Sequence, residues 1–322
     1  MTFSPRTDPP VSAVSAAPAS VVPTTLQVPR RPFRRLREGW PAYLFMLPSV
    51  AFMAYFSYVP AYTAITRAFT DWDGLNVPTF TGLENFRRAL TDPVMGQAAV
   101  NAGIWVVLGL LLAVVPPLII AELIFNLRGE RRQYAWRSVF VVPIVVPSLV
   151  LLLMWGTFFR SDGLINSLLG SVGLGAWRHD WLSDPGTALY SLIFLGFPYV
   201  DVFFLLLLYS GLQNIGQEVF EAGKIDGATG WRRILSLDLP LLRPQLGLIA
   251  VLSIIGNVQY FISPLVLTSG GPGYATTVPA LLMYNTATRN GEYGYAMAIA
   301  VLLMLVVVVL TGASRLIGRE RA

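Results

Sequence analysis

Long runs of uncharged, mainly apolar residues alternate along the chain with short segments that carry nearly all of its charge. A membrane helix needs about 20 apolar residues to cross the hydrocarbon, so each run is a candidate span. The runs cover residues 39–66, 93–121, 138–159, 244–288 and 293–314, and another from 185 to 217 is interrupted only by Asp201. The run 244–288 is too long for one helix. Its turn-rich sequence Ser269-Gly270-Gly271-Pro272-Gly273 predicts one span followed by an external loop.

This pattern predicts an all-α polytopic membrane protein with six transmembrane helices. The predicted spans lie near residues 41–65, 99–125, 137–159, 187–211, 245–267 and 294–315. The composition agrees, because 54% of the residues are hydrophobic and only 13% are charged, about half the charge of a typical soluble domain. An even number of spans places both termini on the same side of the membrane.

The basic residues indicate which side that is. With both termini in the cytoplasm, 17 of the 23 Lys and Arg residues fall in inside segments and 6 in outside segments. Basic residues collect in short cytoplasmic loops, so we predict cytoplasmic termini. Five spans would place some of the basic clusters on opposite sides, and six therefore fits better.

The first 38 residues differ from the rest of the chain. They contain six prolines before residue 30 and an arginine cluster that ends at Arg37, with little apolar surface to bury. We predict a disordered, basic cytoplasmic tail over 1–38 and a transmembrane domain over 39–318. No short apolar core follows the start of the tail, so it does not have the pattern of a cleavable signal peptide.

The residue types exclude several kinds of chemistry. The chain has no cysteine, which removes disulfides, thiolate metal sites and thiol nucleophiles. Its single histidine, His179, argues against a histidine metal site or a Ser/His/Asp triad. Gly223-Lys224 lacks the spacing and the Ser/Thr of a nucleotide-binding loop. We therefore expect no catalytic residue, metal or cofactor on this chain, and no role in binding nucleic acid.

The segment 212–244, between the fourth and fifth predicted spans, has a pattern of its own. Residues 217–226 favour a short helix, and Asp226-Gly227 favours a turn. Residues 230–237 favour a second helix, with Thr229 as its N-cap. We expect Leu239-Pro240 to end that helix and Pro244 to open the next span.

Apolar residues of the second helix share one face. Trp231, Ile234 and Leu235 lie at i, i+3 and i+4. Exposed apolar side chains at a membrane surface favour a soluble partner that covers them. A solvated surface helix without a partner is the alternative.

The residues of this segment resemble a known signature. Glu221-Ala222-Gly223, Asp226-Gly227-Ala228, Leu239-Pro240 and Pro244 follow the order and spacing of the EAA signature of binding-protein-dependent ABC importer permeases. Leu267-Thr268-Ser269-Gly270-Gly271-Pro272 resembles the Leu-Thr-x-Gly-Gly-Pro pattern of the permease type found in maltose and glycerol-3-phosphate systems. The likeness extends over nearly all of the chain after the tail. Two residues depart from the signature: Gly223 replaces the usual second alanine, and Gly216 stands where proline is common.

The resemblance implies a fold, a function and a set of partners. The fold is the ABC importer type I permease fold, and the chain is a transport subunit rather than an enzyme, in an ATP-driven importer of a sugar or related carbohydrate that works by alternating access. The implied partners are a second homologous permease in a heterodimer, two cytoplasmic ATPase subunits that hold ATP and magnesium, and an extracytoplasmic solute-binding protein. That protein would meet the outside segments 67–97, 160–185 and 268–293. The membrane is a bacterial or archaeal cytoplasmic membrane.

The resemblance also assigns the coupling role to the loop 212–244, which would dock on the ATPase. The implied coupling residues are Glu221, Ala222, Gly223, Asp226, Gly227, Ala228, Leu239, Pro240 and Pro244. Physically, Glu221 offers a carboxylate to a basic rim, and Ala222 and Ala228 leave a flat surface.

Polar side chains inside predicted spans are candidates for substrate contacts, because they are costly in a membrane. The candidates are Asp201, Asn257, Gln259, Tyr260, Phe261 and Ser263. Asp201 is the only charge well inside a predicted span, and Asn257, Tyr260 and Phe261 would share one helical face. Hydrogen-bonding groups beside an aromatic ring suit a sugar. Hydrogen bonds to the partner permease are the alternative interpretation.

An ion-coupled secondary transporter of a small polar solute is the alternative function. Such a protein normally has ionisable relays and internal repeats within the membrane, and only Asp201 fits that description. Glu122, near a span end, is predicted to snorkel or to pair with Arg128. His179, between Trp177 and Trp181, is predicted to be interfacial rather than a ligand.

Overall fold

The computed structural model describes residues 40–195, 197 and 200–319. The predicted tail 1–38 lies outside these described residues. The chain divides into two units, Met1–Phe56 and Ser57–Ala322. Within the described residues the structure is helical apart from one short antiparallel pair of strands.

The elements follow one another along the chain with short connections. They are α2 (Trp40–Met53), η1 (Ala54–Tyr58), α3 (Val59–Arg67), β1 (Thr70–Asp71), β2 (Thr79–Phe80), α4 (Glu84–Thr91), α5 (Pro93–Phe125), α6 (Glu130–Val141), η2 (Val142–Val145), α7 (Ser148–Phe158), α8 (Leu164–Ser171), η3 (Gly175–Trp177), α9 (Ala188–Ile193), α10 (Val202–Gln213), α11 (Gln217–Ile225), α12 (Gly230–Arg233), η4 (Ile234–Asp238), α13 (Leu239–Leu241), α14 (Arg243–Gln259), η5 (Pro264–Thr268), α15 (Pro279–Thr288) and α16 (Tyr293–Arg319). Here η1, η4 and η5 are π-helical and η2 and η3 are 3₁₀-helical.

Helix α2 of the first unit carries apolar side chains on all of its faces. Phe45, Phe52 and Met53 are among the exposed ones. A helix that is apolar all round is typical of a membrane span or of a fully buried helix. The candidate span Tyr43–Arg67 begins in α2 and corresponds to the first predicted span.

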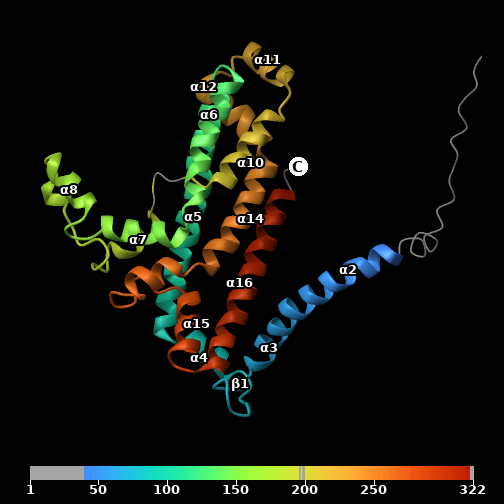
Figure 1. Ribbon diagram of the computed structural model, residues 1–322, viewed down its shortest axis with the longest axis vertical. Helices are drawn as coiled ribbons and strands as arrows, with labels where there is room; N and C mark the ends of the chain where they lie inside the picture. The colour runs from blue at the N-terminus through green and yellow to red at the C-terminus, as the bar shows by residue number, and fades with distance from the viewer. Residues whose placement is uncertain (1–39, 196, 198–199, 320–322) are drawn as a thin grey trace, which may run out of the picture. The chain divides into compact units, whose positions relative to one another are not determined.

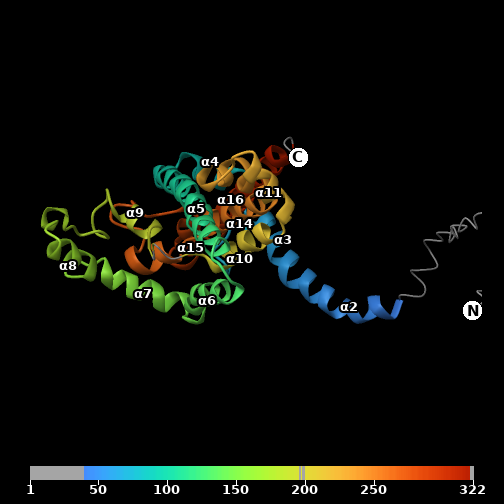
Figure 2. The same ribbon diagram turned by 90° about the horizontal axis from the view of Figure 1, so that it is seen from above.

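The second unit is built around α5. Helices α10 and α14 pack along α5, and α16 packs against α14 and α15 (Figure 1). The same grouping is seen from above in Figure 2. The small buried side chains Ala113 and Ala121 face this core and allow the helices to approach closely. Gly109 of α5 also allows a close approach to α14, because a β-carbon there would lie 2.6 Å from the amide of Asn257.

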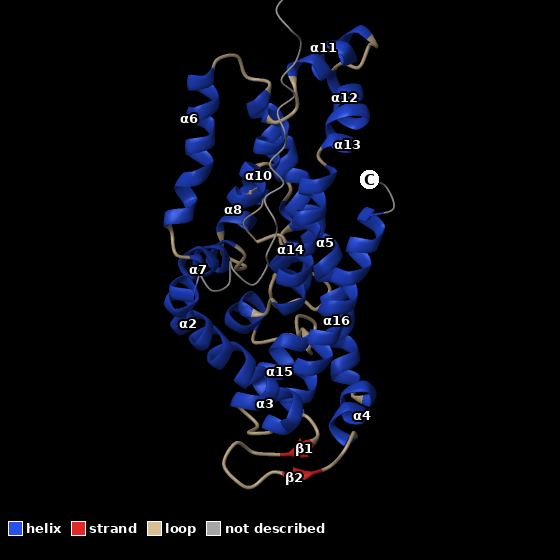
Figure 3. Ribbon diagram, turned by 90° about the vertical axis from the view of Figure 1, so that its right-hand side faces the viewer, coloured by secondary structure: helices blue, strands red, loops and turns tan. Residues whose placement is uncertain are grey.

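The apolar run predicted as the third span forms two helical pieces, which run in different directions (Figure 3). The pieces, Glu130–Val145 and Ser148–Phe158, meet at 89°. Pro147 disfavours a helical conformation in the residue before it, and Val146 is extended, with ψ of 126°. The predicted span 137–159 is therefore a bent pair rather than one helix.

The predicted span 187–211 is also divided. Helix α9 ends at Ile193 and α10 begins at Val202, and residues 196, 198 and 199 between them lie outside the described part. In that part, four helices are long and apolar enough to cross a membrane, and the bent pair makes up to five. The polytopic all-helical class is confirmed, while the count of six and the side of the termini stay predictions.

The turn-rich segment after the fifth predicted span is ordered and helical in part. Gly270 has a φ of 86°, and a β-carbon there would lie 2.6 Å from the hydroxyl of Thr277. That hydroxyl donates a hydrogen bond to the Gly270 carbonyl at 2.9 Å. Helix α15 follows, with Leu281 fully buried, and packs against α5 and α16. The predicted external loop is therefore a fixed turn followed by a packed helix.

The strands β1 and β2 and the helix α4 lie at the same end of the second unit as α15 (Figure 3). Arg88 of α4 forms an ion pair with Glu292 at 2.6 Å, and its guanidinium lies 4.0 Å from the centre of the Tyr295 ring. Partial burial alone would lower the pKa of Arg88, but the hydrogen bond and charge of Glu292 outweigh it and raise that pKa above its usual value. Arg88 therefore remains charged and attaches α4 to the start of α16.

Asn166 organises the segment after α7. Its amide nitrogen donates to the carbonyls of Ser161 at 3.0 Å and His179 at 2.7 Å. Its amide oxygen accepts from the indole of Trp181 at 3.0 Å. Asn166 is 3% exposed, so these bonds are shielded from water and hold the two arms of the segment together. The Nε2 atom of His179 also lies 3.2 Å from a carboxylate oxygen of Asp184.

We predict that Asn166→Ala loosens residues 160–185 without affecting the helices packed on α5. Removing the amide leaves the part-buried hydrogen bonds to Ser161, His179 and Trp181 unmade, which costs about 1–3 kcal/mol of local stability. Hydrogen exchange of peptides from this segment measures the loss. Ser167→Ala is the matched control, because its exposed hydroxyl bonds only to the Gly163 carbonyl. Equal protection in the two variants would contradict the prediction.

Candidate functional site

The first helix of the loop 212–244, α11, ends in a Schellman motif. Gly227 has a φ of 76°, and its N–H donates to the Lys224 carbonyl at 3.1 Å. The N–H of Ala228 donates to the Gly223 carbonyl at 2.7 Å. This pair of bonds satisfies the last carbonyls of the helix. The turn predicted at Asp226-Gly227 is present and reverses the chain.

The second helix of the loop is longer than its sequence suggested. Helices α12, η4 and α13 run without a break from Gly230 to Leu241. The helix ends at Leu241, one residue after the predicted stop at Leu239-Pro240. Thr229 occupies the N-cap position, but its side chain makes no capping hydrogen bond. Pro244 lies in the first turn of α14, as predicted.

The loop exposes several large apolar side chains. Ile225 is 88%, Trp231 72% and Leu235 64% exposed. Glu221 is exposed as well, and its carboxylate accepts a hydrogen bond from Gln217 at 2.8 Å. Ile234 was predicted to share the exposed face of Trp231 and Leu235. It is only partly exposed. In Figure 1, α11 and α12 lie together at the end of the second unit opposite α4 and α15.

The implied coupling residues lie on this structure as follows. Glu221, Ala222, Asp226, Gly227 and Pro244 are exposed, Ala228, Leu239 and Pro240 are half-buried, and Gly223 is buried.

The two departures from the signature fit the backbone. Gly216 has a φ of −59°, which a proline could also adopt. A β-carbon on Gly223 would meet Leu237 at 3.7 Å and Ala228 at 3.8 Å, which are ordinary packing distances. The site therefore has room for the usual alanine.

We predict that Gly223→Ala stabilises α11. Alanine is favoured over glycine in a helix by about 0.5–1 kcal/mol, and the added methyl group makes no clash. Hydrogen exchange of residues 217–228 measures the gain. Gly227→Ala is the control and should lose about 1 kcal/mol, because its positive φ strains any residue with a β-carbon. Loss of protection in both variants would contradict the expected fit at position 223.

A buried group of charged side chains attaches the loop to α5. Arg233 donates from Nη2 to Glu122 at 2.7 Å, from Nε to Asp238 at 2.8 Å and from Nη1 to Asn126 at 2.9 Å. Glu122 is 5% exposed and Asp238 fully buried. The guanidinium also lies 5.5 Å from the centre of the Phe220 ring. We call Arg233, Glu122, Asp238 and Asn126 the Arg233 cluster.

The sequence interpretation missed this cluster. It expected Glu122, beside Arg128, to snorkel or to pair. Glu122 does form an ion pair, but with Arg233. The sequence interpretation also named Asp201 as the one charge within a span, although Glu122 lies in the candidate span Pro93–Phe125. The sequence did not indicate that Asp238 contacts Arg233, since neighbours on an α-helical face are three or four residues apart and these two are five apart.

Asp201 does not lie in the middle of a helix. It is the N-cap of α10, where its carboxylate accepts a hydrogen bond from the Phe204 N–H at 3.1 Å. Its side chain is exposed. A position inside a continuous helix is therefore wrong, and a capping role explains why an aspartate stands there.

The predicted polar face of the fifth span is broken by the backbone. Helix α14 ends at Gln259, and Tyr260 is extended with ψ of 130°, so Asn257, Tyr260 and Phe261 do not share a helical face. Asn257 donates to Ser253 at 2.9 Å, and Gln259 is exposed.

The two residues that follow α14, Tyr260 and Phe261, pack against other aromatic rings. The Tyr260 ring lies 5.4 Å from that of Trp105, and the Phe261 ring lies 5.5 Å from that of Tyr284. Ser263 is buried, and its hydroxyl has no partner within the described residues. The six candidates therefore lie in different local environments.

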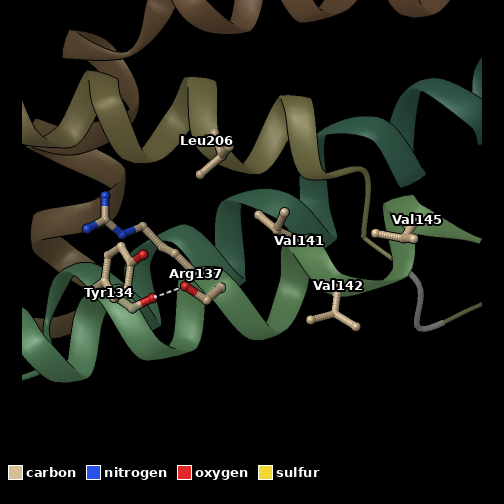
Figure 4. A pocket seen from close by; sticks show the side chains of 7 residues that line it. Tyr134, Arg137, Val141, Val142, Val145 and Leu206 are labelled. Carbon is tan, nitrogen blue, oxygen red and sulfur yellow. Dashed lines mark hydrogen bonds between the residues drawn. The ribbon is translucent and has the colours of Figure 1, made fainter.

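A cavity of about 480 Å³ opens elsewhere, between α6, η2 and α10 (Figure 4). Its polar end is formed by Tyr134, Arg137 and Ser138, and its other end by valines and Leu206. The guanidinium of Arg137 lies 4.6 Å from the centre of the Tyr209 ring. None of the predicted substrate residues lines this cavity.

Comparison with known proteins identifies the family of this chain. Residues 106–321, two thirds of the chain, match the family described as binding-protein-dependent transport system inner membrane component. The chain belongs to this family. It is a multi-pass membrane protein and a permease subunit of an ABC importer, a kind of subunit that is not itself an enzyme. This family membership sets the ion-coupled alternative aside.

Individual relatives match over nearly the whole chain. The trehalose/maltose transport system permease protein MalF of Thermococcus litoralis is 31% identical over 297 residues, covering 89% of this chain and 96% of its own. The lactose transport system permease protein LacF of Rhizobium radiobacter is 29% identical over 288 residues, covering 88% and 95%.

A solved structure has the same fold. A bacterial ABC transporter involved in the import of the acidic polysaccharide alginate matches with a TM-score of 0.77 at 20% identity. The match covers 89% of this chain and 98% of the other. The type I importer permease fold implied by the sequence is therefore confirmed.

Proposed function

We propose that this permease subunit imports a carbohydrate and that its loop 212–244 docks on a cytoplasmic ATPase. The observation that carries the docking site is the exposure of Ile225, Trp231 and Leu235 on two short helices that are anchored to α5. Large apolar side chains on a fixed, water-facing surface favour coverage by a partner protein. Glu221 lies exposed on the same loop and offers a charge to the edge of that interface.

Relatives support a carbohydrate as the cargo. The printed names of similar permeases include lactose, trehalose/maltose and multiple-sugar systems, and the similar solved structure belongs to an alginate importer. Measuring the heat of binding of mono- and oligosaccharides to the associated solute-binding protein identifies the cargo. Binding of amino acids or metal ions in place of every sugar would contradict the proposal.

The proposed assembly contains other chains besides this one. A second homologous permease completes the path in a heterodimer, two ATPase subunits hold ATP and magnesium, and a binding protein delivers solute from outside. One solved relative is in complex with a periplasmic protein that binds an alginate pentasaccharide, which supports the delivery step. The present chain itself is proposed to hold no cofactor.

The orientation follows from the basic residues. Seventeen of the 23 Lys and Arg residues lie in segments proposed to be cytoplasmic, including those of the loop 212–244, and this bias supports the proposal that both termini lie inside. The docking loop then faces the compartment that contains ATP. The membrane is proposed to be a bacterial or archaeal cytoplasmic membrane.

We predict that Trp231→Asp releases the ATPase from the assembled complex. Truncating a central aromatic residue of an interface costs about 2 kcal/mol or more, so the ATPase recovered with the permease should fall by tenfold or more. Quantitative co-purification after mild extraction measures this ratio. Trp177→Asp is the matched control, because Trp177 is 69% exposed but lies on the predicted outer side. Unchanged recovery with the Trp231 variant would remove this residue from the interface.

The candidate substrate residues are part of the proposal. The solute path is proposed to be lined by Asp201, Asn257, Gln259, Tyr260, Phe261 and Ser263. Tyr260 is the strongest of them, because it is 37% exposed and its ring lies beside that of Trp105, tilted by 38°. Such an aromatic surface suits the apolar face of a sugar.

We predict that Tyr260→Ala lowers uptake by about tenfold, through loss of roughly 1.4 kcal/mol of contact with the sugar. Uptake of the sugar identified by calorimetry is measured per assembled complex in proteoliposomes. Tyr260→Phe keeps the ring and should retain most transport. Asn257→Ala separates the two interpretations: reduced uptake in a complex of normal stability supports a sugar contact, and lost stability with normal uptake supports packing against Ser253 and Gly109.

A further inference from the structure

The Arg233 cluster joins two segments far apart in the chain. Arg233 comes from the docking loop, whereas Glu122 and Asn126 belong to the last turn and the end of α5. The three guanidinium nitrogens bind three different side chains. A guanidinium held at three points has little freedom to rotate, because its donors are fixed in one plane. The Arg233 cluster therefore fixes both the distance and the orientation between α12 and α5.

The end of α5 is itself held in place around this cluster. The Asn126 amide donates to the Glu122 carbonyl at 2.7 Å and to its carboxylate at 3.3 Å. The Phe125 ring lies 5.5 Å from that of Phe220 on α11. Polar and aromatic contacts thus connect both helices of the loop to one turn of α5.

A π-helical turn brings Asp238 into the cluster. An α-helix rotates about 100° per residue, so a residue five positions after Arg233 would point about 140° away from it. The segment η4 instead has the wider turn, in which the Leu239 N–H donates to the Ile234 carbonyl. This wider turn places Asp238 2.8 Å from Arg233. Such single π turns inside helices occur often at functional positions.

The two faces of the second loop helix have different tasks. Residues two apart on an α-helix point in nearly opposite directions, and Trp231 is exposed while the side chain of Arg233 is 17% exposed. The exposed face is the one proposed to meet the ATPase. On the opposite face, Arg233 forms buried ion pairs with Glu122 and Asp238. These pairs stay together because separating a buried ion pair is costly.

We propose that Arg233 is the positioning residue that makes the docking loop and α5 move as one body. This inference rests on the proposed docking of the ATPase, and it assigns to the Arg233 cluster the transfer of ATPase movement to the central helix of the permease. Arg233 does not touch solute or nucleotide. It acts by fixing Glu122 and Asn126 relative to the docking face.

Distance measurement between two spin labels tests the proposal. The chain has no native cysteine, so on this chain the labels attach only at Lys224→Cys on α11 and Gly103→Cys on α5, in a complex whose other chains have their accessible cysteines replaced. Both positions are exposed, and a β-carbon at Gly103 meets nothing within 4 Å. About 33 Å of helix separates Gly103 from the end of α5, which gives a measurable separation. The complete complex is measured at rest and after trapping with MgATP and vanadate.

The unmutated complex should keep a narrow distance distribution whose mean changes by less than about 2 Å between the two states, the scale of a small helix shift. The triple variant Glu122→Gln/Arg233→Met/Asp238→Asn removes all three charges together and so avoids leaving one buried alone. Its distribution should broaden about twofold or more, because a released loop samples several positions. Arg128→Gln, an exposed arginine near the same end of α5, should behave as the unmutated chain.

Two results would overturn the inference. One is a changed mean distance on trapping the unmutated complex, which needs no variant and so does not depend on how the triple variant folds. The other is a triple variant with a normal melting temperature and an unchanged narrow distribution, which would leave the cluster with a structural role alone. Loss of the ATPase from the unmutated complex counts against the proposed function, whereas a retained ATPase with a moving loop counts against this inference only.

Discussion

The second unit depends on the close packing of other segments against α5. Small side chains such as Ala113 and Ala121 let α10 and α14 approach, and polar side chains fix the two ends. Near the first turns of α5, Asn101 donates to the carbonyls of Tyr274 and Thr277. In the last turn of α5, Glu122 accepts from Arg233. One helix therefore holds both the turn before α15 and the docking loop.

Much of this fold is predictable from sequence because the membrane imposes a simple rule. Spanning helices must be long and apolar, and the runs that became α5, α14 and α16 meet that rule plainly. The bend between α6 and α7 was visible only as Pro143 and Pro147, since prolines mark a possible break without giving its angle. The split of the fourth predicted span depends on where α10 starts, which the uniformly apolar sequence does not reveal.

The candidate site was predictable where local chemistry decides it. The turn at Gly227 and the exposed Trp231 follow from glycine geometry and helical spacing. The Arg233 cluster could not be found in this way, because Asp238 reaches Arg233 only through a π turn and Glu122 lies more than a hundred residues earlier. Asp201 was misplaced for a related reason, since the start of α10 sets whether an aspartate caps a helix or lies inside it.

The right-angled bend between α6 and α7 determines what this side of the molecule can face. Pro143 has no N–H to offer the carbonyl of Val139, and the extended Val146 interrupts the helical ladder. Lipid tails cannot satisfy such backbone groups, whereas water or another protein can. The cavity lined by Val142 and Val145 lies at this corner. The corner therefore belongs to a wet or protein-covered side of the permease, and the lipid-facing perimeter must run elsewhere.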